Sequence, residues 1–283
     1  LSLETTSYQD TIIPDILFNQ NPRLLLYIFF LTFFMAISLG LIFLLMGRIR
    51  NSLKNLQRKK FVSYALLSIL ISVCVFGICN VIPHAWNPQQ IIKHLGIFLK
   101  APISTMMLLL VPMLILSSIC IFGIFEVSIT IKKNVFSIKN KEESIKLFLG
   151  YKKLLDEYVT IFGLFIATGA IIISSTLSNA LNNHFIDNSL INFVPDEFVY
   201  LYGLAFTAAI VIIYVPVHLR LNVIGTDLIS KMNPLDSNNL EDWNKKNNAN
   251  LEIFGLSTNT WGGVKTSLKV FSPIITSILA SII

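Results

Sequence analysis

Five long runs without a charged side chain limit what this chain can fold into. Each run is 20 to 23 residues long, and together they cover 24–46, 61–82, 103–125, 159–181 and 198–217. A helix rises about 1.5 Å per residue, so each run can cross the roughly 30 Å hydrocarbon core of a bilayer. Lipid offers no hydrogen-bond partner to backbone N–H and C=O groups, so a spanning segment must be a helix or a strand of a closed barrel. Barrel strands alternate apolar and polar residues, and the runs do not show this alternation, so we expect helices. The sequence therefore predicts an all-α polytopic membrane protein with five transmembrane helices.

The composition supports a membrane protein and argues against a nucleic-acid-binding one. Hydrophobic residues make up 54% of the chain and charged residues only 13%, against roughly 25% charged residues in soluble domains. The net charge is +6, but the basic residues lie between the apolar runs, so membrane topology explains them better than a nucleic-acid partner. Cys74, Cys79 and Cys120 all fall within apolar runs without metal-ligand spacing. We expect no metal and no cofactor.

The distribution of basic residues predicts the orientation. The loop after the first run, the loop after the third run and the C-terminal tail together hold 19 of the 22 Lys and Arg residues. The positive-inside rule then places the N-terminus outside and the C-terminus in the cytoplasm, most simply across a bacterial inner membrane. We expect an extracytoplasmic segment at 1–23, a five-helix membrane domain at 24–217 and a cytoplasmic tail at 218–283.

The fourth run carries a stripe of small and polar residues. They are separated by three or four positions, so a helix with 3.6 residues per turn places them on one face. The stripe consists of Thr160, Gly163, Ala167, Ala170, Ser174, Ser178 and Asn182. Small residues let membrane helices approach closely, and hydroxyl or amide groups can also face water. Two interpretations are open: the stripe packs against other helices, or it lines a pore.

The last segment of the chain has the pattern of an amphipathic helix. Gly262 and Gly263 predict a flexible joint before it. Apolar residues then recur every three or four positions, at Val264, Leu268, Phe271, Ile275, Ile278 and Ile282, opposite Lys265, Lys269, Ser272 and Thr276. The uncharged part, 270–283, has only 14 residues, so we expect a buried or interfacial helix rather than a sixth span. A mobile plug beneath a pore is the third possibility.

Two further features connect the cytoplasmic side to the membrane. The segment 141–158 alternates charged and apolar residues, which predicts an amphipathic helix running without a break into the fourth span. The third run contains Pro112. We assign gating or assembly to residues in this span and in the last segment: Pro112, Gly262, Gly263, Leu268, Phe271 and Ile275.

The sequence indicates no enzyme. Hydrolase, metalloprotease, P-loop and dinucleotide-binding motifs do not occur, so there are no catalytic candidates. No charged side chain falls within any run, which disfavours an ion-coupled transporter, the third class considered. A channel or a membrane scaffold that docks a cytoplasmic partner through its basic loops and tail would need none of these features.

We expect a homo-oligomeric channel assembled around the fourth helix and gated from the cytoplasm. The stripe becomes more polar toward Asn182, which helix packing alone does not require. A bacterial effector that depolarises the membrane, for example in antiviral defence, would suit this design. The scaffold is the alternative.

Overall fold

The computed structural model describes residues 22–53, 62–75, 102–138, 140–184, 197–235, 239–256 and 260–282, and all of its regular elements are helices. In chain order these are α2 (Pro22–Leu53), a short helix (Val62–Val75), α5 (Pro102–Ser137), α6 (Lys141–Thr160), the π-helix η1 (Ile161–Ala167), α7 (Thr168–His184), α8 (Glu197–Met232), α9 (Leu240–Ile253) and α10 (Thr260–Ile282). The prediction of an all-α chain is confirmed for the described residues.

Four of the described helices are long and apolar enough to cross a membrane. They are Leu25–Arg48, Val111–Ser137, Lys141–Thr176 and Val199–Met232, which contain most of the first, third, fourth and fifth predicted runs. The second run appears as the helix Val62–Val75, and its remainder lies outside the described residues. The helices are compatible with an integral membrane protein, while the fifth span and the predicted orientation remain predictions.

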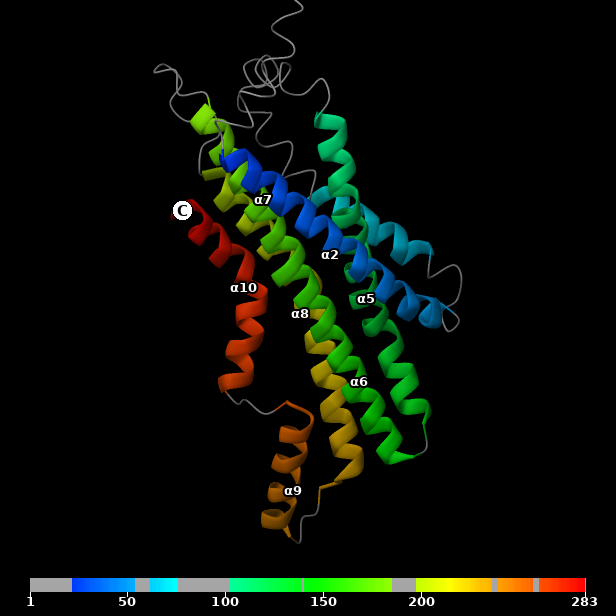
Figure 1. The fold of residues 1–283 in the computed structure, drawn as a ribbon. Coiled ribbons are helices and arrows are strands. Elements are labelled where there is room, and N and C mark those ends of the chain that lie inside the picture. The colour runs from blue at the N-terminus through cyan, green and yellow to red at the C-terminus, as the bar shows by residue number, and fades with distance from the viewer. Residues whose placement is uncertain are drawn as a thin grey trace, which may run out of the picture.

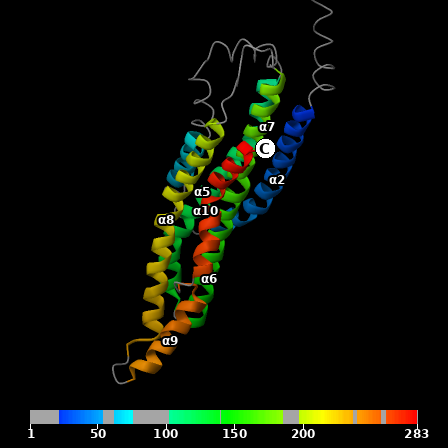
Figure 2. The same ribbon diagram turned by 90° about the vertical axis from the view of Figure 1, so that its left-hand side faces the viewer.

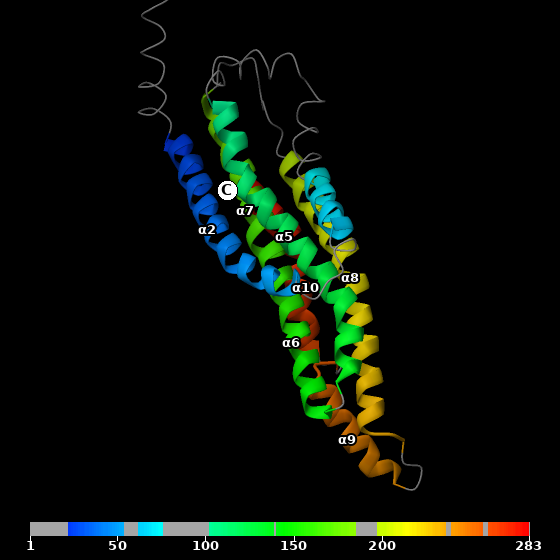
Figure 3. The same ribbon diagram turned by 90° about the vertical axis from the view of Figure 1, so that its right-hand side faces the viewer.

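The helices form an elongated bundle (Figure 1). α5, α6 and α8 lie side by side, and α6 continues through η1 into α7 as one uninterrupted helix, as the sequence predicted for 141–158. α2 crosses this bundle at a slant and packs against α5 and α7 (Figures 1 and 3). α10 runs along α8 and also contacts α7 and η1, whereas α9 forms the end of the molecule remote from α7 (Figures 1 and 2).

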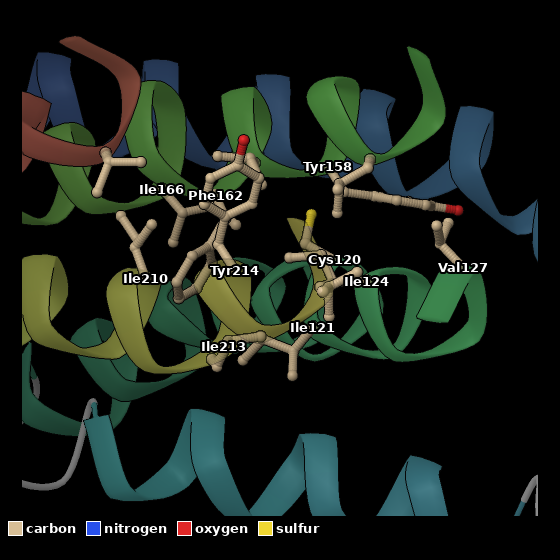
Figure 4. Close-up of a cluster of buried hydrophobic side chains, with 14 of the residues drawn as sticks. Cys120, Ile121, Ile124, Val127, Tyr158, Phe162, Ile166, Ile210, Ile213 and Tyr214 are labelled. Carbon is tan, nitrogen blue, oxygen red and sulfur yellow. The ribbon is translucent and has the colours of Figure 1, made fainter. Parts of the chain in front are cut away.

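The centre of the bundle is filled by large apolar side chains. Figure 4 shows Cys120, Ile121 and Ile124 of α5 meeting residues of η1 and α8 across the core. Phe162 and Phe206 are both fully buried there, with their ring centroids 6.5 Å apart. Such dense packing of large side chains fixes the relative positions of α5, η1 and α8.

Glycines let the outer helices approach this core. A β-carbon on Gly169 of α7 would lie 2.7 Å from the ring of Phe34 in α2. A β-carbon on Gly123 of α5 would overlap the ring of Tyr158, which is fully buried in α6. The short helix Val62–Val75 is held to α5 by a hydrogen bond of 3.0 Å between the hydroxyls of Ser72 and Ser117.

The outside of the bundle is apolar along several helices. Large hydrophobic side chains are exposed on α2, on Val62–Val75, on α8 and on α10, for example Phe43, Leu66, Ile212 and Phe271. A soluble protein rarely exposes apolar surface this extensively. The pattern is the one expected where acyl chains surround the helices.

α10 turns its small and polar face toward the bundle. Leu268, Phe271 and Ile275 are exposed, whereas Lys269 and Ser272 are buried against neighbouring helices. The predicted amphipathic pattern is present, and whether this helix is buried, interfacial or spanning stays a prediction.

The glycine pair of α10 departs from the prediction. Gly262 and Gly263 lie within the first turn of α10, which begins at Thr260, and do not form a joint before it. The first four N–H groups of a helix have no partner within it, so glycine weakens a first turn less than a helix interior. The two glycines therefore lie within the helix and not before it, and their flexibility stays a prediction.

The close contact between α5 and α6 gives a direct stability test. Replacing Gly123 by Ala forces its new methyl group against the Tyr158 ring, and we expect a loss of roughly 1–3 kcal/mol in the free energy of unfolding. Gly40→Ala is the matched control, because nothing lies within 4 Å of its β-carbon, and it should gain about 0.5–1 kcal/mol from helix propensity. Unfolding titrations in detergent, followed by circular dichroism, measure both; equal effects would contradict the packing described.

Candidate functional site

Two adjacent carboxylates at the end of α6 tie this helix to two neighbours. Asp156 accepts a hydrogen bond of 2.5 Å from the ammonium Nζ of Lys269 in α10. Glu157 forms an ion pair with Arg48 of α2. Because successive helical residues point about 100° apart, the two pairs hold α6 from different directions, immediately before η1 begins.

The Asp156–Lys269 pair is unevenly exposed to solvent. The Lys269 side chain is only 11% exposed, whereas that of Asp156 is 55% exposed. A buried ammonium without a partner is costly, so Lys269 depends on Asp156 more than Asp156 depends on Lys269. The pair therefore fixes the position of α10 on α6.

A proline in α10 shapes the same contact. Pro273 has no N–H, so the carbonyl oxygen of Lys269, four residues earlier, loses its usual helical donor. The hydroxyl of Ser272 donates to this oxygen instead, at 2.9 Å. The same oxygen faces Gly163 of η1, where a β-carbon would lie only 2.7 Å away. Here α10 touches the backbone of the fourth predicted span directly.

The partner of this contact is itself an irregular helix. Ile161–Ala167 is a π-helix with wider turns than the α-helices on either side of it. The hydroxyl of Thr168 lies 3.3 Å from the carbonyl oxygen of Gly163 and donates to it. Short π-helical segments occur frequently at functional sites, and this one is adjacent to both ion pairs. We call Asp156, Glu157, η1, Lys269 and Pro273 the helix junction.

The π-helix divides the predicted stripe. A single continuous face requires 3.6 residues per turn throughout, and the wider turn changes the phase of α7 relative to α6, so the prediction of one unbroken stripe is wrong. Beyond the π-helix, Ser175 is buried and donates to the carbonyl oxygen of Ala280 in α10, at 3.0 Å. Ser174, which the stripe predicted, is only partly buried.

The remaining stripe residues occupy different environments. Thr160 donates to the carbonyl oxygen of Asp156, at 2.6 Å. Ala167 is fully buried, and Ala170 is partly buried against the core. Ser178 and Asn182 belong to α7, and their side chains lie outside the described residues. Among the stripe residues whose side chains the structure describes, only Gly163 and Ala167 are buried.

The predicted gating residues do not gather at the helix junction. Pro112 is buried inside α5, in the apolar half of the bundle. The two glycines lie in the first turn of α10, and Leu268, Phe271 and Ile275 point away from the bundle.

Sequence reasoning missed the charged and small residues that hold α10. Lys269 was placed only on the face opposite the apolar residues, although its position four residues before Pro273 leaves its carbonyl oxygen without the usual helical donor. Gly203 of α8 was not singled out, although a β-carbon there would lie 2.9 Å from the carbonyl oxygen of Pro273 and would also clash with Ser277. Asp156 was overlooked because it is one of several charges in a basic loop.

The polar end of the bundle is connected to the helix junction through α6. Lys152 donates to the carbonyl oxygens of Phe254, at 2.7 Å, and Gly255, at 2.6 Å, in the turn after α9. The buried Phe254 ring packs 5.2 Å from that of Phe148, and Gly255 takes a φ of +59°, which favours glycine. One helical turn separates Lys152 from Asp156, so α6 carries both attachments.

The described residues offer no cluster of three His, Cys, Asp or Glu side chains that could hold a metal ion. Comparisons with protein-family models, with curated proteins and with solved structures find no match to this chain. The helix junction therefore has to be interpreted from its own geometry, which is that of a mechanical connection between helices.

Unequal burial of the Asp156–Lys269 pair predicts unequal effects of its two substitutions. Asp156→Asn leaves a buried ammonium without its carboxylate, and we expect a loss on the order of 2–3 kcal/mol, near the lower end for a buried pair because Asp156 is half-exposed. Lys269→Met leaves a carboxylate that water can solvate, so its cost should stay within about 1 kcal/mol. Unfolding titrations in detergent measure both.

The double variant Asp156→Asn/Lys269→Met should recover most of the loss, because no unpaired charge is left buried. Glu241→Gln is the control, since it breaks the exposed ion pair between Glu241 and Lys245 on α9. Equal losses for the two single variants, with strict additivity in the double variant, would show that the pair is not coupled.

Proposed function

We propose that this protein is a subunit of an oligomeric membrane channel that is gated from the cytoplasmic side. The observation that carries this proposal is the helix junction. α6, η1 and α7 form one helix that leads from the charged end of the bundle into its apolar half, and ion pairs from α2 and α10 hold it where the two halves meet.

The helix junction is suited to switching between two arrangements. Both ion pairs include at least one partner that is more than half exposed, so water can solvate that partner when the pair opens. The π-helix η1 interrupts the regular α-helical hydrogen-bond pattern between α6 and α7, and such segments occur frequently at functional sites. A force on α6, applied through α9 and Lys152, would therefore reach α7 at this point.

The conduction path proposed here runs between subunits. Within one chain, large side chains fill the core between α5, η1 and α8 (Figure 4), and α10 covers Gly163. We assign the pore to α7, along which the predicted stripe continues with Ser174, Ser178 and Asn182. The lipid bilayer and further copies of the chain are the partners, and a bacterial inner membrane is the proposed location.

Ion flux through liposomes tests the channel. Purified protein reconstituted into liposomes should pass ions, and Asp156→Asn should change the rate several-fold because it releases α10 from α6. Ser174→Leu combined with Ser178→Leu should reduce the flux by narrowing the path, whereas Glu241→Gln should leave it unchanged. If intact oligomers of the unaltered chain pass no ions under any condition, the channel is rejected.

A scaffold is the second candidate, and α9 favours it. None of the described side chains of α9 is buried, although both ends of the helix are fixed. Asn233 and Trp243 exchange hydrogen bonds of 3.1 and 3.3 Å at one end, and Lys152 holds the turn at the other. α9 exposes Lys245 and Lys246 beside Glu241, Asp242 and Glu252. A helix held at both ends in this way can present a polar surface of mixed charge to a protein partner.

Charge reversal on α9 separates the two candidates. Lys245→Glu with Lys246→Glu should abolish co-purification of a cytoplasmic partner that docks at α9, because two exposed cations of this helix become anions. Lys132→Glu with Lys133→Glu makes the same charge change on exposed residues in the basic loop after the third run, and the comparison shows whether the partner docks at α9 or at that loop. Retention of the partner by the α9 variant, measured by quantitative mass spectrometry of the purified complex, would count against docking at α9.

A further inference from the structure

We propose that α10 is embedded in the bilayer, with its outer face in contact with lipid acyl chains. This goes beyond the proposed function, since it concerns the placement of a segment that the sequence assigned to a cytoplasmic tail. It holds whether the protein is a channel or a scaffold.

The contacts of α10 place it beside two predicted spans. The carbonyl oxygen of Lys269 meets Gly163, and that of Ala280 accepts a hydrogen bond from Ser175, so α10 follows the fourth run over most of its length. The carbonyl oxygen of Pro273 meets Gly203 in the fifth run. Figures 1 and 2 show α10 running beside α8 toward the end of the molecule where α7 terminates.

The part of α10 that follows Lys269 is long enough to reach past the middle of a bilayer. From Lys269 to the last helical residue, Ile282, α10 extends about 20 Å at 1.5 Å per residue. The hydrocarbon core is roughly 30 Å thick. If Lys269 lies near the cytoplasmic boundary with Asp156, the end of α10 lies in the outer half of the membrane.

The polarity of α10 is reversed relative to a helix on a water-soluble protein. Its inner face buries Lys269, Ser272 and Ser277 against the bundle. Its outer face exposes large apolar side chains to between 40% and 56%: Leu268, Phe271, Ile275, Ile278 and Leu279. In water this arrangement would expose the surface that the hydrophobic effect buries. In lipid it is favourable, because polar and small side chains then belong between helices.

Lipid, rather than a protein partner, explains the extent of the apolar surface. The exposed apolar face of α10 is one of several, since α2, Val62–Val75 and α8 also expose such residues, including Phe29, Leu70 and Leu204. A single docked protein would cover one face. Lipid that surrounds the protein explains all of these exposed apolar faces.

Spin labels on the outer face of α10 test this placement. Cys74, Cys79 and Cys120 are first replaced by alanine, and single cysteines are then introduced as Ile275→Cys and Leu279→Cys. The labelled protein is reconstituted into vesicles of phosphatidylcholine and phosphatidylglycerol. Electron paramagnetic resonance compares collision with oxygen, which concentrates in lipid, and with a water-soluble nickel chelate.

We expect the ratio of oxygen to nickel accessibility to be several-fold higher at residues 275 and 279 than at the control Ile253→Cys on α9, and similar to that at Ile212→Cys on α8. Both control positions are exposed apolar residues, so the comparison isolates their surroundings. High nickel accessibility at 275 and 279 would place α10 in water and overturn the proposal. Low accessibility to both reagents, with dipolar broadening between labels, would show that a second copy covers this face and would also overturn it.

Discussion

One backbone carbonyl constrains much of this structure. Pro273 deprives the Lys269 oxygen of its helical donor, and an apolar environment makes an unsatisfied carbonyl expensive. The Ser272 hydroxyl donates a hydrogen bond to this oxygen, and the lack of a side chain on Gly163 lets this turn of α10 approach η1 closely. The side chain of the same Lys269 reaches Asp156. A single turn of α10 therefore brings together a proline, an ion pair and a glycine contact, and this turn determines how α10 lies on α6 and η1.

The helix junction also separates two kinds of surface. Beyond it, toward α7, the outward side chains are apolar and the contacts between helices use glycine and serine. Before it, toward α9, the helices are joined by polar contacts, such as the hydrogen bond of 2.6 Å from Asn134 to the Tyr151 hydroxyl. Because α6 passes through both regions without a break, a displacement at the polar end has a continuous rigid element through which to travel.

The sequence predicted most of the fold and little of the helix junction. The long helices could be identified from the length of the uncharged runs, because a helix crosses lipid only if it is long enough and carries few charges. The stripe from Thr160 was projected onto an ideal α-helix, and no local signal marks the π-helix that divides it. The amphipathic pattern of α10 could be read from the sequence, but a pattern does not say which face meets the bundle, and the structure places Lys269 there and Phe271 outside. Asp156 could not be paired with Lys269 by pattern, because more than a hundred residues separate them.

The reversed polarity of α10 has a consequence for biogenesis. Inserted alone, this segment would carry the Lys269 ammonium into hydrocarbon without its carboxylate, which is costly. The residues that contact α10 from other helices all precede it in the chain: Asp156, Gly163, Ser175 and Gly203. The ribosome thus delivers α10 after the helices whose residues hold it.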